Sequence, residues 1–345
     1  MKFGFLSLGD LSSDPVSGVT PTAKQRLDEI VAAAVLTEEL GLDSFGLGEH
    51  HSSRWVLTSP PTVLAAIAAR TKHIRLRTGV TLIPNLDPVR VAEDYATVDV
   101  LSGGRVELTV AKGNFPQPWS LFGQDPAEQR ERLAEGIDLL LKIWREDPVT
   151  WTGRFRPPLV DASVAPRPLQ SPPPVWCGVS STPASVEFAA ERGLPIVVAG
   201  VFREREHCGA LIDHYRAEGA AAGHDPDTLR VGYVSHLHLS RNGTKAKRNF
   251  ERYYRHSTAQ AVAEMREPMP PLDYEERLRG PLICGSPAEA VEKILGFRER
   301  FDHDLHLFHA DLGGLPFRDV AETMELFAGE VAPVIEREIR HVAAA

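Results

Sequence analysis

Short apolar runs alternate with amphipathic segments along the whole chain. Eight runs rich in β-branched and aromatic residues each predict a short buried strand, and they begin near Phe3, Ser44, Ile74, Val106, Val175, Ile196, Val231 and Leu305. Between them apolar residues recur at helical spacing, as in Leu27, Ile30, Val31, Ala34 and Val35, or Leu133, Ile137, Leu140, Leu141 and Trp144. Regular alternation of strand and helix predicts a parallel sheet, and eight units favour a closed (β/α)8 TIM barrel over an open sheet.

The predicted helix starts carry a common signal, in which a capping side chain is followed by proline. These pairs are Thr20-Pro21, Ser59-Pro60, Asp87-Pro88, Asp125-Pro126, Thr182-Pro183 and Ser286-Pro287. Two of them, Asp125 with Glu128 and Ser286 with Glu289, also have the spacing of a capping box. We therefore expect the helices to begin at these pairs.

Two connections are too long for simple turns. They cover residues 147–174, which are rich in proline, and residues 256–281, which are rich in charge and proline. Long loops in compact domains often cover a site. The sequence therefore predicts one domain over residues 1–345, a barrel with insertions in its connecting loops.

Composition and charge exclude several classes of function. The chain has 43% hydrophobic and 25% charged residues, as globular proteins do, and a formal net charge of −9. Nucleic acids and anionic membranes select basic surfaces, so we expect neither as a partner. The N-terminal apolar run is too short for a signal peptide, and Cys177, Cys208 and Cys284 are scattered and odd in number. These features predict a cytoplasmic protein.

Candidate chemistry lies where the predicted strands end, because the active sites of such barrels lie at the C-terminal ends of their strands. The second strand is followed by Glu49-His50-His51. Adjacent side chains on an extended chain point in opposite directions, so at most one imidazole can face the barrel mouth squarely. One histidine could act as a general acid or base near neutral pH with its neighbour in support. Alternatively, the pair is structural.

Further histidines are found near the last two predicted strands, and they raise the alternative of a metal-dependent hydrolase. They are His236, His238, His303, His306 and His309. The pair of histidines on the first strand that barrel hydrolases commonly carry is missing. We therefore expect no metal.

An anion site is predicted in the segment Val179-Ser180-Ser181-Thr182-Pro183-Ala184-Ser185. A strand ends, hydroxyl side chains cluster and a helix begins, so free N–H groups and hydroxyls converge with the helix dipole behind them. The same residues would equally suit a plain Thr182 N-cap. No phosphate-binding fingerprint of the Walker or Gly-x-Gly-x-x-Gly type is present in the sequence, which disfavours nucleoside triphosphates and a Rossmann dinucleotide.

Four stretches follow one another in a specific order and spacing, and they are Gly48-Glu49-His50-His51, Pro88-Val89-Arg90 with Glu93-Asp94, Gly103-Gly104-Arg105, and Ala189-Ala190-Glu191-Arg192-Gly193-Leu194-Pro195. In these stretches the sequence resembles the bacterial luciferase-like flavin monooxygenase family, and the resemblance extends over nearly its whole length. It implies a (β/α)8 barrel that binds reduced flavin mononucleotide (FMN), delivered by a separate reductase. The reduced flavin reacts with O2 to oxidise a small organic substrate.

The resemblance also assigns roles to residues. His50 matches the catalytic histidine, and Gly79-Val80 match a site that tends to hold a non-proline cis peptide under the flavin ring. Ser181, Thr182 and Ser185, which follow Val179, match the residues that hold the flavin phosphate. Lys112 falls where luciferase has an arginine that contacts this phosphate; lysine keeps the charge but loses the bidentate geometry. Residues 256–281 fall where the family has a mobile loop.

Two other functions stay open. Relatives on the same barrel use a deazaflavin for hydride transfer, but they usually resemble Ser-Asp-His where this chain has Glu49-His50-His51. A non-catalytic flavin-binding subunit is the other alternative, and the presence of His50 counts against it. The resemblance further implies a homodimer, and the alanine-rich segment 62–70 would permit close packing of the second and third helices.

Overall fold

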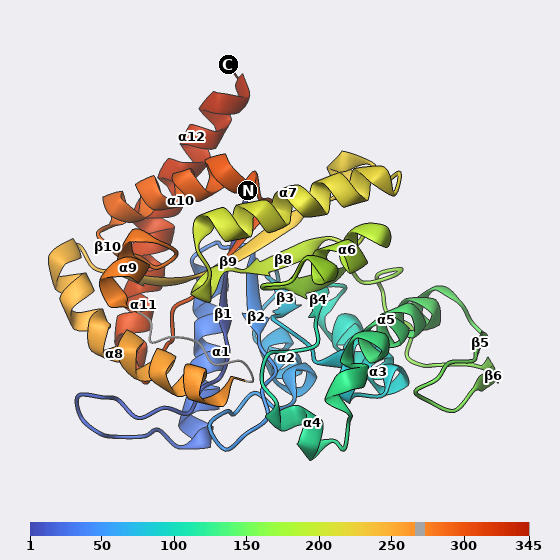
Figure 1. The fold of residues 1–345 in the computed structure, drawn as a ribbon. Coiled ribbons are helices and arrows are strands. Elements are labelled where there is room, and N and C mark those ends of the chain that lie inside the picture. Colours follow the sequence, from blue (N-terminus) through green and yellow to red (C-terminus); the bar gives the residue numbers. More distant parts are fainter. Residues whose placement is uncertain (266–272, 345) are drawn as a thin grey trace.

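The computed structural model describes residues 1–265 and 273–344, and its centre is a closed parallel barrel (Figure 1). The eight barrel strands are β1 (Lys2–Ser7), β2 (Ser44–Leu47), β3 (Arg75–Thr78), β4 (Val106–Val110), β7 (Val175–Val179), β8 (Ile196–Ala199), β9 (Val231–Leu239) and β11 (Leu305–His309). Their order follows the chain, and pairing of β8 with β9 closes the ring. The predicted (β/α)8 TIM barrel is confirmed, and each strand begins within one residue of its predicted start.

Helices surround the barrel and connect successive strands (Figure 1). They are α1 (Ala23–Glu39), α2 (Pro60–Ala68), α3 (Pro88–Ser102), α5 (Gln129–Arg145), α6 (Pro183–Glu191), α7 (Arg205–Ala221), α8 (Gly243–Glu264), α10 (Pro287–Phe301), α11 (Phe317–Leu326) and α12 (Ala332–Ala344). In the part of the chain that the structure describes, no helix is long and apolar enough to cross a membrane.

The insertions carry secondary structure of their own. Residues 147–174 contain an antiparallel hairpin of β5 (Val149–Trp151) and β6 (Leu159–Ala162), and the short helix α4 (Gln117–Leu121) follows β4. The stretch 256–281 was expected to be a loop, and this expectation is wrong for most of it. Helix α8 continues to Glu264, and α9 (Tyr274–Arg279) leads into β10 (Ile283–Gly285), which pairs with the end of β9. Residues 266–272 of the expected mobile loop lie outside the described residues.

The predicted helix starts are confirmed in part. Ser286 and Glu289 form the expected capping box on α10. Helix α1 begins at Thr22 rather than at Thr20-Pro21, because the Thr22 hydroxyl accepts a hydrogen bond from the Gln25 amide and the Gln25 side chain accepts one from the Thr22 amide. These reciprocal bonds satisfy two amides that the predicted start would leave open.

Asp125 does not form the expected capping box with Glu128. Its side chain accepts from the Ala127 amide and caps a 3-10 turn, and Glu128 turns instead to the guanidinium groups of Arg132 and Arg154. A charge-assisted contact with a guanidinium is stronger than a bond to a backbone amide that water can also satisfy. The prediction of helix α5 was right, but this detail of its start was wrong.

Strand alternation decides which side chains face the barrel interior. On β11, His306 and Phe308 are outward residues that stack on each other with ring centroids 4.3 Å apart, and Phe308 also packs against Phe327. Leu307 and His309 alternate with them and line the interior cavity. Successive side chains of a strand point to opposite faces, so β11 both fills the core and supplies an imidazole to the barrel mouth.

Candidate active site

A cavity of about 290 Å³ lies at the C-terminal ends of the barrel strands. Its walls include residues from most strand ends, among them Leu6, Glu49, His50, His51, Gly79, Val80, Lys112, Val179, Ser181, Thr182, Ser185, His236 and His309. All eight residues expected from the sequence to be catalytic or to bind cofactor therefore line a single cavity. Barrels of this kind carry their active sites at this face.

His50 lies in an aromatic cluster at one side of the cavity. Its ring stacks on Trp55 with centroids 4.2 Å apart and meets the edge of Phe115 at 5.3 Å. The His50 Nδ1 atom is buried without a hydrogen-bond partner. The sequence did not single out Trp55 or Phe115, because both lie in irregular loops that no periodic pattern marks.

Burial lowers the pKa of His50 to about 3, and the positive charge that His309 can carry adds to this effect. The expectation that His50 titrates near neutral pH is therefore wrong. An imidazolium enclosed by aromatic and aliphatic side chains loses its hydration. His50 is a neutral imidazole at physiological pH, able to accept or donate one hydrogen bond.

Glu49 orients His51 and not His50. Its carboxylate accepts from His51 Nε2 at 2.8 Å and from the Leu82 amide at 2.9 Å, and it is 3% exposed. Its own amide donates to the carbonyl of Val80. Glu49 thus joins the end of β2 to the segment after β3, where the peptide bond between Gly79 and Val80 is cis, as the resemblance implies.

Two further imidazoles face the cavity. His236 on β9 and His309 on β11 lie side by side, with ring centroids 5.2 Å apart. His309 Nε2 lies 3.2 Å from Asp311 Oδ1, and both residues are buried. Burial, together with the charge that His309 can carry, holds the pKa of His236 well below its usual value. The cavity therefore has four histidines, His50, His51, His236 and His309, in different electrostatic surroundings.

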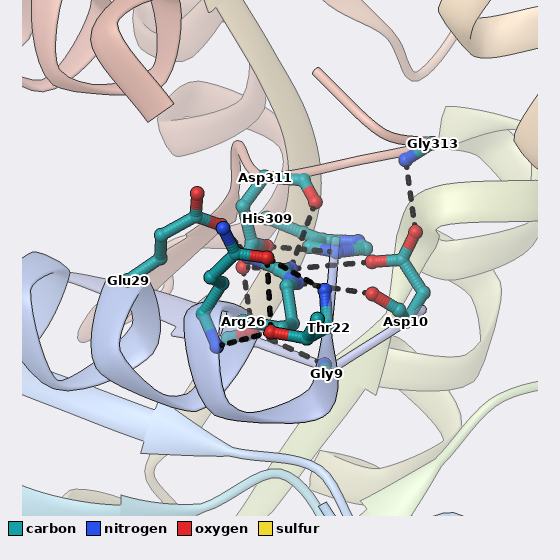
Figure 2. A network of polar contacts seen from close by, with 10 residues as sticks. Gly9, Asp10, Thr22, Arg26, Glu29, His309, Asp311 and Gly313 are labelled. Carbon is teal, nitrogen blue, oxygen red and sulfur yellow. Dashed lines mark hydrogen bonds and ion pairs between the residues drawn. The ribbon is translucent and has the colours of Figure 1, made fainter. Parts of the chain in front are cut away.

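Asp311 belongs to a buried polar network around Arg26 of α1 (Figure 2). Arg26 Nη2 donates to Asp311 Oδ2 at 2.6 Å, and Arg26 Nε donates to the carbonyl of Asp10 at 3.0 Å. Ser7 Oγ also donates to Asp311 Oδ2. Burial raises the pKa of Asp311, but Arg26, His309 and Ser7 together outweigh it, and the pKa lies well below its usual value. Asp311 is therefore a fixed carboxylate beside His309.

The same network holds the loop that supports His50. Asp10 forms an isolated antiparallel bridge with Trp55, and the amide of Val56 donates to the carbonyl of Gly9 at 2.8 Å. Arg26 thereby connects helix α1 to the residue on which His50 stacks. Sequence reasoning missed Arg26, since nothing local distinguishes it from a solvated helical arginine.

The predicted anion site lies at the start of α6. Thr182 occupies the N-cap position, but its side chain makes no capping bond; its hydroxyl contacts the Ser185 hydroxyl at 2.9 Å. The interpretation of Thr182 as a plain N-cap residue is therefore wrong. Pro183 has no N–H group and the Ser185 amide donates to the Thr182 carbonyl, so an anion here would rely on the Ala184 amide and the two hydroxyls, all of which line the cavity.

Two cations line the cavity, Lys112 after β4 and Arg130 in the first turn of α5. Lys112 was expected from the resemblance, whereas Arg130 was missed. No sequence pattern distinguishes a single arginine in the first turn of a helix. Arg130 lines the cavity because the first turn of α5 lies next to it.

The other histidines of the last strands lie outside this cavity. His303 Nε2 and His306 Nδ1 are 3.1 Å apart, and His306 Nε2 lies 2.9 Å from Ser235 Oγ in a buried chain of hydrogen bonds. His238 stacks on Phe250 of α8. Within residues 1–265 and 273–344, no group of histidine, cysteine or carboxylate side chains could hold a metal ion.

A second and wider cleft of about 1530 Å³ lies between α9 and α10. Its two lysines have partners within the protein: Lys247 pairs with Glu289, and Lys293 Nζ donates to the carbonyls of Leu278 and Leu282. The other charged residues of its lining are mostly acidic, as on a solvated surface. We therefore place the candidate active site in the barrel mouth.

The family model described as luciferase-like monooxygenase matches residues 1–304. The oxygenase component of flavin-dependent trigonelline monooxygenase from Acinetobacter baylyi is 24% identical over 332 residues, which cover 90% of this chain and 91% of that protein. An F420-dependent glucose-6-phosphate dehydrogenase from Amycolatopsis mediterranei is 27% identical over 327 residues, 88% of this chain and 93% of that protein. The crystal structure of monooxygenase RslO1 from Streptomyces bottropensis matches with a TM-score of 0.86 and 27% identity, over 97% of this chain and 99% of that one.

Proposed function

Because the chain belongs to the luciferase-like monooxygenase family, we propose that it is the oxygenase of a two-component system. It takes reduced FMN from a separate reductase and uses O2 to oxidise a small organic molecule. The observation that carries the proposal is that the hydroxyl cluster at the start of α6 and His50 line one and the same cavity.

The residues present fit FMN. The uncapped start of α6, the hydroxyls of Ser181, Thr182 and Ser185, and the cations Lys112 and Arg130 suit a dianionic phosphate. Between this end and His50, the lining is mostly apolar and suits a flat ring system.

A glycine on β7 keeps part of this space open. A Cβ atom at Gly178 would lie 2.8 Å from Val80 and 3.1 Å from Ala111. We assign Gly79, Val80 and Val179 to the walls that hold the ring and the adjoining chain.

Bound reduced FMN supplies two electrons to O2. The surrounding residues bind the phosphate, exclude water and control one proton. Since His50 Nδ1 is buried, Nε2 is the atom that exchanges a proton or hydrogen bond with a ligand. A neutral imidazole at this position donates a hydrogen bond to, or accepts one from, an oxygen atom bound beside it, and so positions the proton of that group.

A deazaflavin-dependent dehydrogenase is the second candidate function, and similarity to the F420-dependent relative favours it. The discriminating experiment is an anaerobic titration with reduced FMN and with reduced deazaflavin, followed by mixing with O2. The proposal expects tight binding of reduced FMN and oxygen-dependent oxidation of a co-substrate. Tight binding of the deazaflavin alone, with no reaction with O2, would establish the second function instead.

Three features complete the proposal. The chain acts as one domain over residues 1–345, it is cytoplasmic, and it forms a homodimer through α2 and α3. On α2 the small side chains of Ala66 and Ala69 are exposed and would allow a second copy to approach closely. A reductase delivers the flavin from outside this chain, and no nucleic acid or membrane takes part.

A further inference from the structure

Four histidines line the cavity. His51 contacts the Glu49 carboxylate at 2.8 Å, and the other three imidazoles, those of His50, His236 and His309, differ in their distance from negative charge. His50 stacks between aromatic rings, and His236 packs against His309 and the edge of Tyr254. His309 has a carboxylate at ion-pair distance: its Nε2 lies 3.2 Å from Asp311 Oδ1, and both atoms are buried with no hydrogen bond to another group. When neighbouring titratable groups have such different surroundings, their protonation states separate.

The charge balance of the buried network around Arg26 also favours a positive charge on His309. Arg26 contacts two buried carboxylates, Asp10 at 3.3 Å and Asp311 at 2.6 Å, and a third, half-buried one on Glu29 at 3.7 Å. One guanidinium balances one carboxylate, and an unbalanced buried charge is costly. His309 is placed to supply the second positive charge.

The groups around His309 are compatible with a positive charge on its ring. His309 contacts Asp311 after β11 and His236 of β9, and its charge acts on His50 after β2. Behind Asp311 lie the other charged groups of the network, which are Arg26 and Glu29 of α1 and Asp10 after β1 (Figure 2). Burial lowers the pKa values of His50 and His236, and a positive His309 lowers them further. One protonated and two neutral imidazoles are therefore mutually consistent.

One wall of the same cavity is aromatic. Trp55 and Phe115, with ring centroids 6.0 Å apart, both contact His50, and the bridge from Asp10 supports Trp55. Flat aromatic walls favour aromatic ligands through offset and edge contacts. A positive charge in a cavity with such a wall favours a ring that carries an acidic hydroxyl group.

We propose that His309 is protonated in the resting protein and that it makes this side of the cavity a site for a phenol, which binds as its phenolate. This inference rests on the proposed function, because it names the substrate class of the same site. On binding, the hydroxyl proton leaves to solvent and no electron is transferred. Asp311 acts as a positioning residue that keeps the imidazolium in place.

The first test measures the charge of His309 directly. Long-range proton–nitrogen correlation spectra of the full chain, labelled with 15N-histidine and saturated with oxidised FMN, distinguish imidazolium from neutral imidazole. The His309 signal is assigned by its loss in His309→Gln. We expect both nitrogens protonated at pH 7 in the parent and only one in Asp311→Asn, where Arg26 still balances Asp10. His236→Gln is the matched control and should leave His309 protonated. A neutral His309 in the parent protein overturns the proposal.

The second test addresses the ligand class with 4-fluorophenol, whose 19F shift reports its ionisation. An opposite charge within about 4–6 Å shifts a pKa by about 1–3 units, so we expect at least about tenfold more anion at a given pH when the probe is bound. His309→Gln and Asp311→Asn should abolish this shift, whereas His236→Gln should keep it. Fluorobenzene, which lacks the hydroxyl group, should bind equally to all four proteins.

Absence of binding, or binding without a shift in ionisation, overturns the phenolate site. FMN affinity is measured on the same samples. Weak FMN binding by the parent would count against the proposed function while leaving the His309 result interpretable.

Discussion

The strongest test of the flavin site removes hydroxyl groups at the start of α6. In the double variant Ser181→Ala with Ser185→Ala, Thr182 keeps its hydroxyl but loses the contact with Ser185 Oγ, which is 2.9 Å long. The backbone amides of α6 stay in place, since alanine does not disturb the N-terminal geometry. The variant therefore removes side-chain donors and leaves the helix terminus intact.

The expected loss follows from the strength of bonds to a phosphate. A hydrogen bond to a charged group contributes about 1.5–3 kcal/mol, and 1.4 kcal/mol corresponds to about tenfold in affinity. Two such bonds give about 3–6 kcal/mol. In the parent, the Ser185 hydroxyl gives up its contact with the Thr182 hydroxyl when it binds the phosphate, so the net contribution to FMN binding is smaller than this sum. We expect FMN to bind about 100-fold more weakly or worse.

Riboflavin provides the comparison, because it carries the ring system without the phosphate. Dissociation constants for both flavins are obtained from fluorescence titration of parent and variant. Ser59→Ala is the matched control: Ser59 precedes α2, makes no capping bond and contacts the Thr62 hydroxyl at 2.8 Å, as Thr182 contacts Ser185. Ser59 is outside the cavity, so its variant should bind FMN like the parent. Equal weakening of FMN and riboflavin in the double variant would refute the phosphate assignment.

Three further predictions concern the catalytic histidine, acid stability and assembly. His50→Ala should bind reduced FMN almost normally, lose about 10²–10⁴-fold in substrate oxidation and release more hydrogen peroxide; oxidation at the parent rate with saturating flavin would make His50 structural. Burial lowers the pKa of His306 to about 3, against about 6.5 in the unfolded chain. The unfolded chain thus binds more protons between these values, and stability falls as the pH drops below about 6.5. Urea unfolding at pH 7 and pH 5 should show a loss from this group of about 2 kcal/mol, and this part of the loss should be absent in His306→Gln; an unchanged pH dependence in the variant would contradict the assignment. Light scattering at micromolar concentration should give the mass of a dimer, and Ala66→Glu on α2 should give a monomer; a monomeric parent would end the dimer hypothesis.

Local pattern was sufficient to predict the architecture. The period of apolar residues marks each strand and helix within a few residues, and alternation of the two leaves few topologies for eight units. The same pattern located the polar strand ends, so the sequence alone assigned His50 and the Ser181–Ser185 segment to the face formed by the C-terminal ends of the strands. Resemblance to a family then supplied their expected roles.

The properties of these residues depend on closure of the barrel. No sequence pattern shows that Glu49 binds His51, that burial takes the pKa of His50 to about 3, or that Arg130 returns to the cavity. Arg26 and Asp311 are 285 positions apart in the chain, yet their ion pair fixes a carboxylate beside His309. Hydrophobic periodicity is a short-range property that the chain carries in each segment. Desolvation and charge pairing arise only when distant segments meet, and they decide which histidine is neutral and which can hold a proton.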